Sequence, residues 1–166
     1  MAQTQKLMEK GKASIQPART ISKVGIIGAG QMGSGIAHVV ALSGYTVALN
    51  DLKKEAYDKG VEAVGKNLAR QIAKGAINED DRDKALDRIS FAPTLEAFGD
   101  CDLVIEAATE DESLKHRIFA ALCPHLKPTA LLASNTSSIS ITRLAATTDR
   151  PEDFIGMHFM NPVPLM

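Results

Sequence analysis

Tryptophan is absent from this 166-residue sequence, and aromatic residues make up only 4% of it. Few side chains are therefore available to stack on nucleic-acid bases. No excess of charge of either sign is present, because 19 lysines and arginines are balanced by 20 aspartates and glutamates. Proteins that bind nucleic acids or membrane surfaces through charge carry basic clusters. We therefore expect no nucleic-acid partner and no membrane partner.

Cysteine is scarce as well, since Cys101 and Cys123 are the two thiols of the sequence and form no CxxC pattern. This usage argues against a zinc site or a disulfide framework and fits a reducing, cytoplasmic compartment. The segment Cys123-Pro124-His125 offers a pair of metal-ligating side chains, but two ligands do not close a site. We expect no bound metal.

Residues 1–20 are polar and basic, lack the apolar core of a signal peptide and contain no stretch long enough to span a membrane. We expect a flexible leader there. The remaining residues, 21–166, are enough for one α/β domain with a single hydrophobic core.

A short apolar run at residues 24–27 leads into a GxGxxG loop made by Gly28, Gly30 and Gly33. The first glycine permits a tight turn, the second lets the backbone approach a pyrophosphate, and the third lets the next helix pack on the strand. That helix is expected over residues 31–42, with its free N–H groups pointing at the anion. The loop predicts a phosphate cradle formed by Gly28, Ala29, Gly30, Gln31, Met32 and Gly33.

Asp51 directly follows the next expected strand, residues 46–50. An acidic residue about 20 residues after the glycine loop is placed to accept both hydroxyls of an adenosine ribose, and it would repel a 2′-phosphate. Lys53 and Lys54 follow and could hold such a phosphate. The sequence favours NAD over NADP on this basis. The alternative is a glycine-rich turn that only joins strand to helix, with Asp51 starting or capping the next helix.

Strands and helices alternate along the chain, which predicts a parallel sheet with right-handed crossovers. One connection is unusually long, because residues 53–88 have two helical patterns separated by Gly75 and Asn78. We interpret it as an inserted helical hairpin. Further strands are expected over 89–91, 101–107, 130–133 and 154–159, and further helices from 111 or 112 to 124 and over 139–146.

Polar side chains cluster where two of these strands end. Residues 134–138 read Ser-Asn-Thr-Ser-Ser, and His158 and Asn161 follow the last strand. Ligands of doubly wound sheets bind at that edge. Spacing alone favours Ser137 or Ser138 as the N-cap of the helix over 139–146. A lone histidine among apolar residues is more often a core side chain than a catalytic one.

The segments GAGQMGSGIA, VIEAATE, SNTSSISIT and HFMNPVP occur in this order, with Asp51 between the first two. Together they closely resemble the NAD-binding domain of the L-3-hydroxyacyl-CoA dehydrogenase family, particularly its bacterial 3-hydroxybutyryl-CoA members, from about residue 22 to residue 166. The resemblance implies a Rossmann-type, doubly wound, mainly parallel sheet. It also implies NAD as cofactor and a short-chain acyl-CoA as substrate.

The resemblance assigns roles to residues that match the family motifs. His158 corresponds to the catalytic histidine, which takes the 3-hydroxyl proton while the C3 hydride passes to the nicotinamide. Ser137 would touch both substrate and cofactor. Lys74, in the hairpin, matches a lysine that meets the phosphates of coenzyme A. The implied cofactor contacts are the residues of the glycine loop, Asp51, Glu110, Lys115, Asn135, Ser137 and Asn161.

Two parts of the family pattern are absent from this sequence. The glutamate that orients the histidine follows the HFMNPVP motif in the family, and a largely helical C-terminal domain forms most of the dimer interface. Since the sequence ends at Met166, we expect it to be the cofactor-binding half of a homodimeric dehydrogenase, poorly active alone. The alternatives are a non-catalytic NAD-binding or crystallin-like module, and a different Rossmann enzyme of the phosphogluconate or methyltransferase type.

Overall fold

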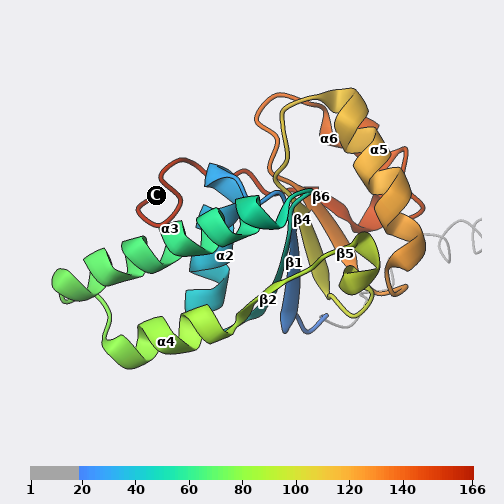
Figure 1. The fold of residues 1–166 in the computed structure, drawn as a ribbon. Coiled ribbons are helices and arrows are strands. Elements are labelled where there is room, and N and C mark those ends of the chain that lie inside the picture. The colour runs from blue at the N-terminus through green and yellow to red at the C-terminus, as the bar shows by residue number, and fades with distance from the viewer. Residues whose placement is uncertain (1–18) are drawn as a thin grey trace, which may run out of the picture.

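A six-stranded parallel sheet forms the centre of the computed structural model, which describes residues 19–166 (Figure 1). The leader expected over residues 1–20 lies, up to residue 18, outside the described residues. The strand order is β3-β2-β1-β4-β5-β6, that of a doubly wound dinucleotide-binding sheet. The predicted fold class is confirmed. The strands are β1 (Lys23–Ile27), β2 (Thr46–Asn50), β3 (Ile89–Phe91), β4 (Leu103–Glu106), β5 (Leu131–Ser134) and β6 (Phe154–Gly156).

Helices cover both faces of the sheet. On one face lie α2 (Gln31–Leu42), α3 (Lys54–Ala73) and α4 (Glu79–Asp87), and on the other lie α5 (Glu112–Leu122) and α6 (Ile141–Ala145) (Figure 1). Ile36 and Leu68 are among the buried side chains of the first layer, and Phe119 and Leu122 of the second. Short 3₁₀ turns complete the chain at η1 (Leu95–Phe98), η2 (Cys123–His125) and η3 (Pro151–Asp153).

The predicted helical hairpin is confirmed as α3 and α4, which extend past the edge of the sheet (Figure 1). Gly75 breaks the first helix with φ of +68°, a conformation that glycine adopts without strain. Asn78 then caps the second helix, since its side chain accepts the Asp81 N–H at 2.9 Å and Asp81 accepts the Asn78 N–H at 3.0 Å. The predicted interruption at Gly75 and Asn78 is therefore confirmed.

The helix expected over residues 139–146 is shorter, and its predicted cap is wrong. Ser140 is the N-cap of α6, and its side chain accepts the Arg143 N–H at 3.3 Å. Ser137 and Ser138 lie before the helix and donate hydrogen bonds to Glu110 instead. The local sequence offers several hydroxyls in a row, and two of these serines bind the carboxylate of Glu110, in the loop after β4, instead of capping the helix.

Two predicted strands are also shorter than expected. The strand expected over 101–107 is only Leu103–Glu106, and the side chain of Asp102, just before it, accepts the backbone N–H groups of Ser22 and Lys23. The strand expected over 154–159 ends at Gly156, so that His158 lies in the loop beyond it.

The strand order reverses between β1 and β4, the two central strands. Their carboxyl ends are joined by a hydrogen bond in which Ala107 N–H donates to Ile27 O at 2.8 Å. The crevice beyond such a reversal is where doubly wound sheets bind their ligands. Within residues 19–166, no helix is both long and apolar enough to cross a membrane.

Candidate cofactor and substrate site

The three glycines of the motif between β1 and α2 have different surroundings. Gly28 has φ of +99°, and a Cβ there would lie 2.8 Å from Ala107 O. A Cβ on Gly33 would lie 1.7 Å from Gly28 O, so the helix could not pack where it does. At Gly30 no atom lies within 4 Å of the added Cβ. The protein's own packing thus requires the first and third glycines, whereas the second faces open space that a ligand can fill.

A hollow of about 480 Å³ adjoins the loop on the side of β2, and we call it the Asp51 hollow. The Asp51 carboxylate accepts the Ala29 N–H at 2.8 Å and so holds the loop as well as lining the hollow. Lys54, a candidate ligand for a 2′-phosphate on sequence grounds, instead contacts both oxygens of Asp58 at 2.7 and 2.9 Å. This arrangement favours an unphosphorylated ribose beside Asp51.

A second hollow, of about 410 Å³, lies on the other side of Ala107 and Ala108, which line both. We call it the His158 groove. It brings together site residues predicted from separate segments of the chain. Its lining includes Met32, Glu110, Asn135, Ser137, His158 and Asn161.

Hydrogen bonds between loops set the shape of the His158 groove. Asn135, just after β5, accepts the Phe159 N–H at 2.7 Å and thereby holds the loop that carries His158. Asn161 accepts from the Gln31 side chain at 3.1 Å, which ties the same loop to the start of α2. The His158 side chain itself is exposed to the groove, so its interpretation as a core histidine is wrong.

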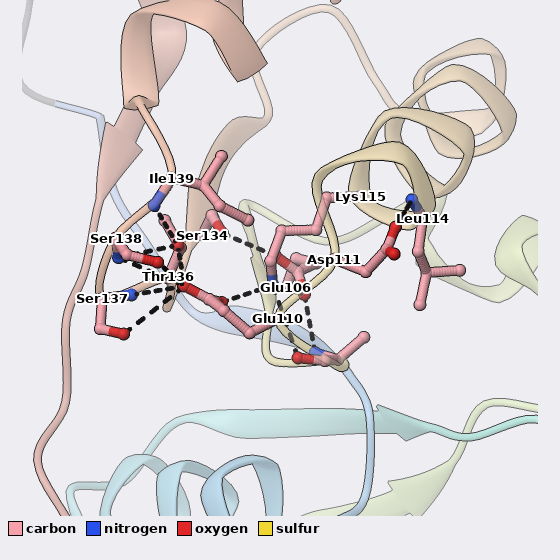
Figure 2. A network of polar contacts seen from close by, with 11 residues as sticks. Glu106, Glu110, Asp111, Leu114, Lys115, Ser134, Thr136, Ser137, Ser138 and Ile139 are labelled. Carbon is pink, nitrogen blue, oxygen red and sulfur yellow. Dashed lines mark hydrogen bonds and ion pairs between the residues drawn. The ribbon is translucent and has the colours of Figure 1, made fainter.

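Glu110 fastens the loop after β5 to the loop after β4 (Figure 2). One carboxylate oxygen accepts from Thr136 Oγ1 at 2.5 Å, Ser138 Oγ at 3.0 Å, Ser137 N at 3.1 Å and Ser138 N at 3.2 Å. Burial by itself would raise the pKa of Glu110, but these hydrogen bonds and the nearby Lys115 ammonium outweigh it and lower the pKa to about 2. The loop is therefore held by a carboxylate that stays charged near neutral pH.

Lys115 and Glu106 lie beneath this loop, out of contact with solvent. Lys115 Nζ is 2.6 Å from Glu106 Oε1 and 3.6 Å from Glu110 Oε2. The lysine expected to contact NAD thus has its ammonium buried between carboxylates, with 1% of its surface exposed. The sequence motifs assign no role to Glu106. One feature of the sequence could have pointed to Glu106, because it is an acidic residue at the end of the otherwise apolar strand Leu103–Glu106.

A third hollow, of about 580 Å³, runs between α2, α3 and the segment 161–164. Asn161 and Gln31 line it, and Asn161 also lines the His158 groove, so the two hollows adjoin. Lys59 and Asn67 line it from α3. Lys74 is exposed at the C-cap of α3 and lies outside these three hollows. The structure therefore does not bring Lys74 to the His158 groove.

Comparison with known proteins places the chain among dehydrogenases. Residues 23–166 match the family described as "3-hydroxyacyl-CoA dehydrogenase, NAD binding domain". A 3-hydroxybutyryl-CoA dehydrogenase from Bradyrhizobium diazoefficiens is 59% identical over 149 residues, which cover 90% of this chain and 51% of the relative. One from Mycobacterium tuberculosis is 44% identical over 147 residues, covering 88% and 51%.

A solved structure supports the same assignment. The (S)-3-hydroxybutyryl-CoA dehydrogenase from Ralstonia eutropha matches with a TM-score of 0.86 at 46% identity, covering 89% of this chain and 52% of that one. The chain spans about half the length of the curated relatives it matches. The residues that make the strand order, the glycine loop and the His158 groove all fall inside the matched range. The chain belongs to the 3-hydroxyacyl-CoA dehydrogenase family, and residues 23–166 are its NAD-binding domain.

Proposed function

We propose that this chain is the cofactor-binding part of an NAD-dependent dehydrogenase that interconverts (S)-3-hydroxyacyl-CoA and 3-ketoacyl-CoA with a short acyl chain. One observation carries the proposal. His158, Ser137, Asn135 and Asn161 line a single groove that shares Ala107 and Ala108 with the hollow beside Asp51. His158, whose imidazole can accept a proton, therefore lies in a groove that adjoins the proposed dinucleotide site at the Asp51 hollow. Family membership removes the phosphogluconate-type and methyltransferase alternatives.

The residues around the glycine loop fit NAD. Gly30 leaves room for a pyrophosphate, and α2 begins there without a side-chain cap, so its first N–H groups are available to an anion. Asp51 would accept the ribose hydroxyls in the Asp51 hollow. On the other side of Ala107 and Ala108, the Glu110 loop, Asn135, Ser137 and Asn161 would surround the nicotinamide half. We also propose that residues 21–166 form the NAD-binding domain.

Bound NAD supplies the acceptor for the C3 hydride of the substrate. Neutral His158 accepts the 3-hydroxyl proton in the oxidative direction, and its imidazolium returns the proton in the reductive direction. Ser137, which lines the same groove, would hold the substrate oxygen by its hydroxyl. Neither ring nitrogen of His158 has a hydrogen-bond partner within residues 19–166. Without an orienting carboxylate, such a histidine can lose up to about 10⁴-fold in rate.

The third hollow, along α3, is the proposed path of coenzyme A. It opens beside the His158 groove at Asn161 and runs past Lys59 and Asn67. Lys74 lies one residue beyond the end of α3, where an ammonium can meet a phosphate. We further propose a cytoplasmic location, which agrees with the two cysteines being free and buried, and a homodimeric parent protein, which rests on the family resemblance alone.

The test combines NADH titration with turnover of acetoacetyl-CoA by residues 1–166. We expect the chain to bind NADH, to oxidise it slowly in the presence of the ketoacyl-CoA, and to lose that oxidation in His158→Gln with unchanged NADH affinity. His125→Gln, in η2 and outside the lining of the three hollows, is the matched control and should leave both unchanged. No NADH binding would contradict the proposal. Turnover that is the same in His158→Gln as in the parent chain would contradict the catalytic role of His158 and favour a non-catalytic NAD-binding or crystallin-like module.

A further inference from the structure

Lys54 is the first residue of α3 and follows Asp51 by three positions, at the carboxyl end of β2. The chain folds back at this point, since Asp51 Oδ1 accepts the Lys53 N–H at 3.4 Å. Dinucleotide-binding sheets that accept NADP hold its 2′-phosphate here with a basic side chain. Lys54 has the charge for that role, yet it does not line the Asp51 hollow.

Asp58, one turn further along α3, binds the Lys54 ammonium. Lys54 Nζ is 2.7 Å from Asp58 Oδ1 and 2.9 Å from Asp58 Oδ2. The same nitrogen lies 5.9 Å from the ring centroids of Tyr57 and Phe91, whose own centroids are 4.9 Å apart. A cation within about 6 Å of an aromatic ring face is attracted to it. One carboxylate and two rings thus draw the ammonium towards α3 and the end of β3.

The stability of α3 does not account for this ion pair. A cation in the first turn of a helix faces the positive end of the helix dipole. In pairs spaced by four residues, the acidic residue is better placed before the lysine than after it. Lys54 and Asp58 have the less favourable order, whereas Glu62 and Lys66 on the same helix have the favourable one, at 2.6 Å. The Lys54–Asp58 pair therefore calls for a reason outside the helix.

We propose that Asp58 is a specificity-determining residue of the cofactor site, because it keeps Lys54 from serving as the cation for a 2′-phosphate. Asp51 then disfavours NADP by repulsion, and Asp58 disfavours it by occupying a lysine that would otherwise attract it. The inference rests on the proposed function, since it takes the Asp51 hollow to be the site of the adenosine ribose.

The experiment is a titration with NADPH and with NADH in a chain that carries Asp51→Asn. The amide removes the repelling charge, and its carbonyl can still accept the Ala29 N–H that Asp51 accepts. In this background, Asp58→Asn should strengthen NADPH binding by about threefold to fivefold, the range that one exposed ion pair supports. NADH affinity should stay within about twofold. An unchanged NADPH affinity would overturn the inference.

Lys54→Met tests whether the gain depends on that lysine. When Lys54→Met and Asp51→Asn are both present, adding Asp58→Asn should change NADPH affinity by less than about twofold. A gain of the original size would assign the 2′-phosphate to another cation, such as Lys53, or to the loss of negative charge in general. Either result would overturn the inference.

Glu62→Gln is the matched control, because it removes the same charge from the same helix and frees Lys66 instead of Lys54. Glu62 and Lys66 lie outside the lining of the three hollows. In the Asp51→Asn background this control should change NADPH affinity by less than about twofold, and a gain equal to that of Asp58→Asn would overturn the inference.

Two further outcomes have a defined meaning. If Asp51→Asn does not fold, Asp51→Ser replaces it as the background, since a hydroxyl oxygen can also accept a hydrogen bond. Failure of the parent chain to bind NADH would overturn the proposed function, and the inference with it. NADH binding by the parent without a gain in NADPH affinity from Asp58→Asn would overturn the inference alone.

Discussion

Gly30 and Gly33 lie three residues apart in one loop, yet an added Cβ would meet different surroundings at each. Gly33 packs against the carbonyl of Gly28, a backbone atom that cannot rotate away. Gly30 faces open space beside the Asp51 hollow. The fold itself therefore requires Gly33, whereas the role that we propose for Gly30 is to leave room for a ligand. Substitution separates the two kinds.

Gly33→Ala should lower the free energy of unfolding by about 3 kcal/mol or more, because the backbone has to move to admit the methyl group. Gly30→Ala should leave stability almost unchanged and weaken NADH binding by about tenfold, because its Cβ would occupy the place of the pyrophosphate. Urea unfolding and NADH titration measure the two effects.

Gly65→Ala provides the matched control, since no atom lies within 4 Å of a Cβ there and the residue is inside α3. We expect this variant to be more stable by about 0.5–1 kcal/mol with normal NADH affinity. A Gly30→Ala variant with normal NADH affinity would contradict the placement of the pyrophosphate.

At the scale of elements, Asp102 links three segments at the amino-terminal edge of the sheet, opposite the candidate site. Its carboxylate accepts from Ser22 N at 2.8 Å and Lys23 N at 2.9 Å, at the start of β1, and pairs with Lys127 at 2.5 Å, in the loop before β5. These contacts hold the amino ends of β1, β4 and β5 in register. The Lys127 ammonium first, and then the N–H groups of Lys23 and Ser22, lower the pKa of Asp102 well below its usual range.

Asp102→Asn should lower the free energy of unfolding by about 2 kcal/mol at neutral pH, because hydrogen bonds to a charged acceptor are lost. A carboxyl whose pKa is lower folded than unfolded stabilises the protein above about pH 4, and this contribution is lost as the pH falls further. The deficit of the variant should therefore shrink towards about pH 2. Urea unfolding of both proteins across this range is the measurement, and a deficit that stays constant would contradict the assignment.

At the scale of the whole molecule, the proposed sites for NAD and for coenzyme A lie in different parts of the fold. The hollows on either side of Ala107 and Ala108 adjoin the carboxyl edge of the sheet, whereas the third hollow is lined by α3. That helix extends away from the sheet (Figure 1). The hairpin of α3 and α4 is thus a platform added to a dinucleotide-binding sheet. Its buried side chains, such as Val64 and Leu68, join the same core as α2.

Lys74→Ala should weaken coenzyme A binding by several-fold, consistent with loss of one exposed ion pair of up to about 1 kcal/mol, while NADH affinity stays unchanged. The matched control is Lys66→Ala, on the same helix, whose ammonium already pairs with Glu62 at 2.6 Å. Calorimetric titrations with each ligand separate the two effects. An equal loss of coenzyme A affinity in both variants would contradict a specific role for Lys74.

Local pattern was enough to predict most elements of this fold. The helix Gln31–Leu42 and the strand Thr46–Asn50 have the bounds expected from the sequence, because apolar spacing and the flanking glycines act within a few residues. The same holds for the hairpin and its break at Gly75 and Asn78. The candidate site residues were found chiefly through family motifs, and their roles stay predictions.

Other features depended on contacts between residues far apart in the sequence. Ser137 and Ser138 bind Glu110 and do not cap α6, and Glu110 lies 26 to 28 residues before the hydroxyls of Thr136 and Ser138 that it holds. The burial of Lys115 depended on Glu106 being at the end of β4, beneath the meeting point of two loops. The sequence by itself determined the order of strands and helices and the position of the glycine loop, since these follow from short-range patterns. Only the tertiary structure decided how charged side chains pair at the sheet edge, because parallel strands bring together residues that no local pattern links.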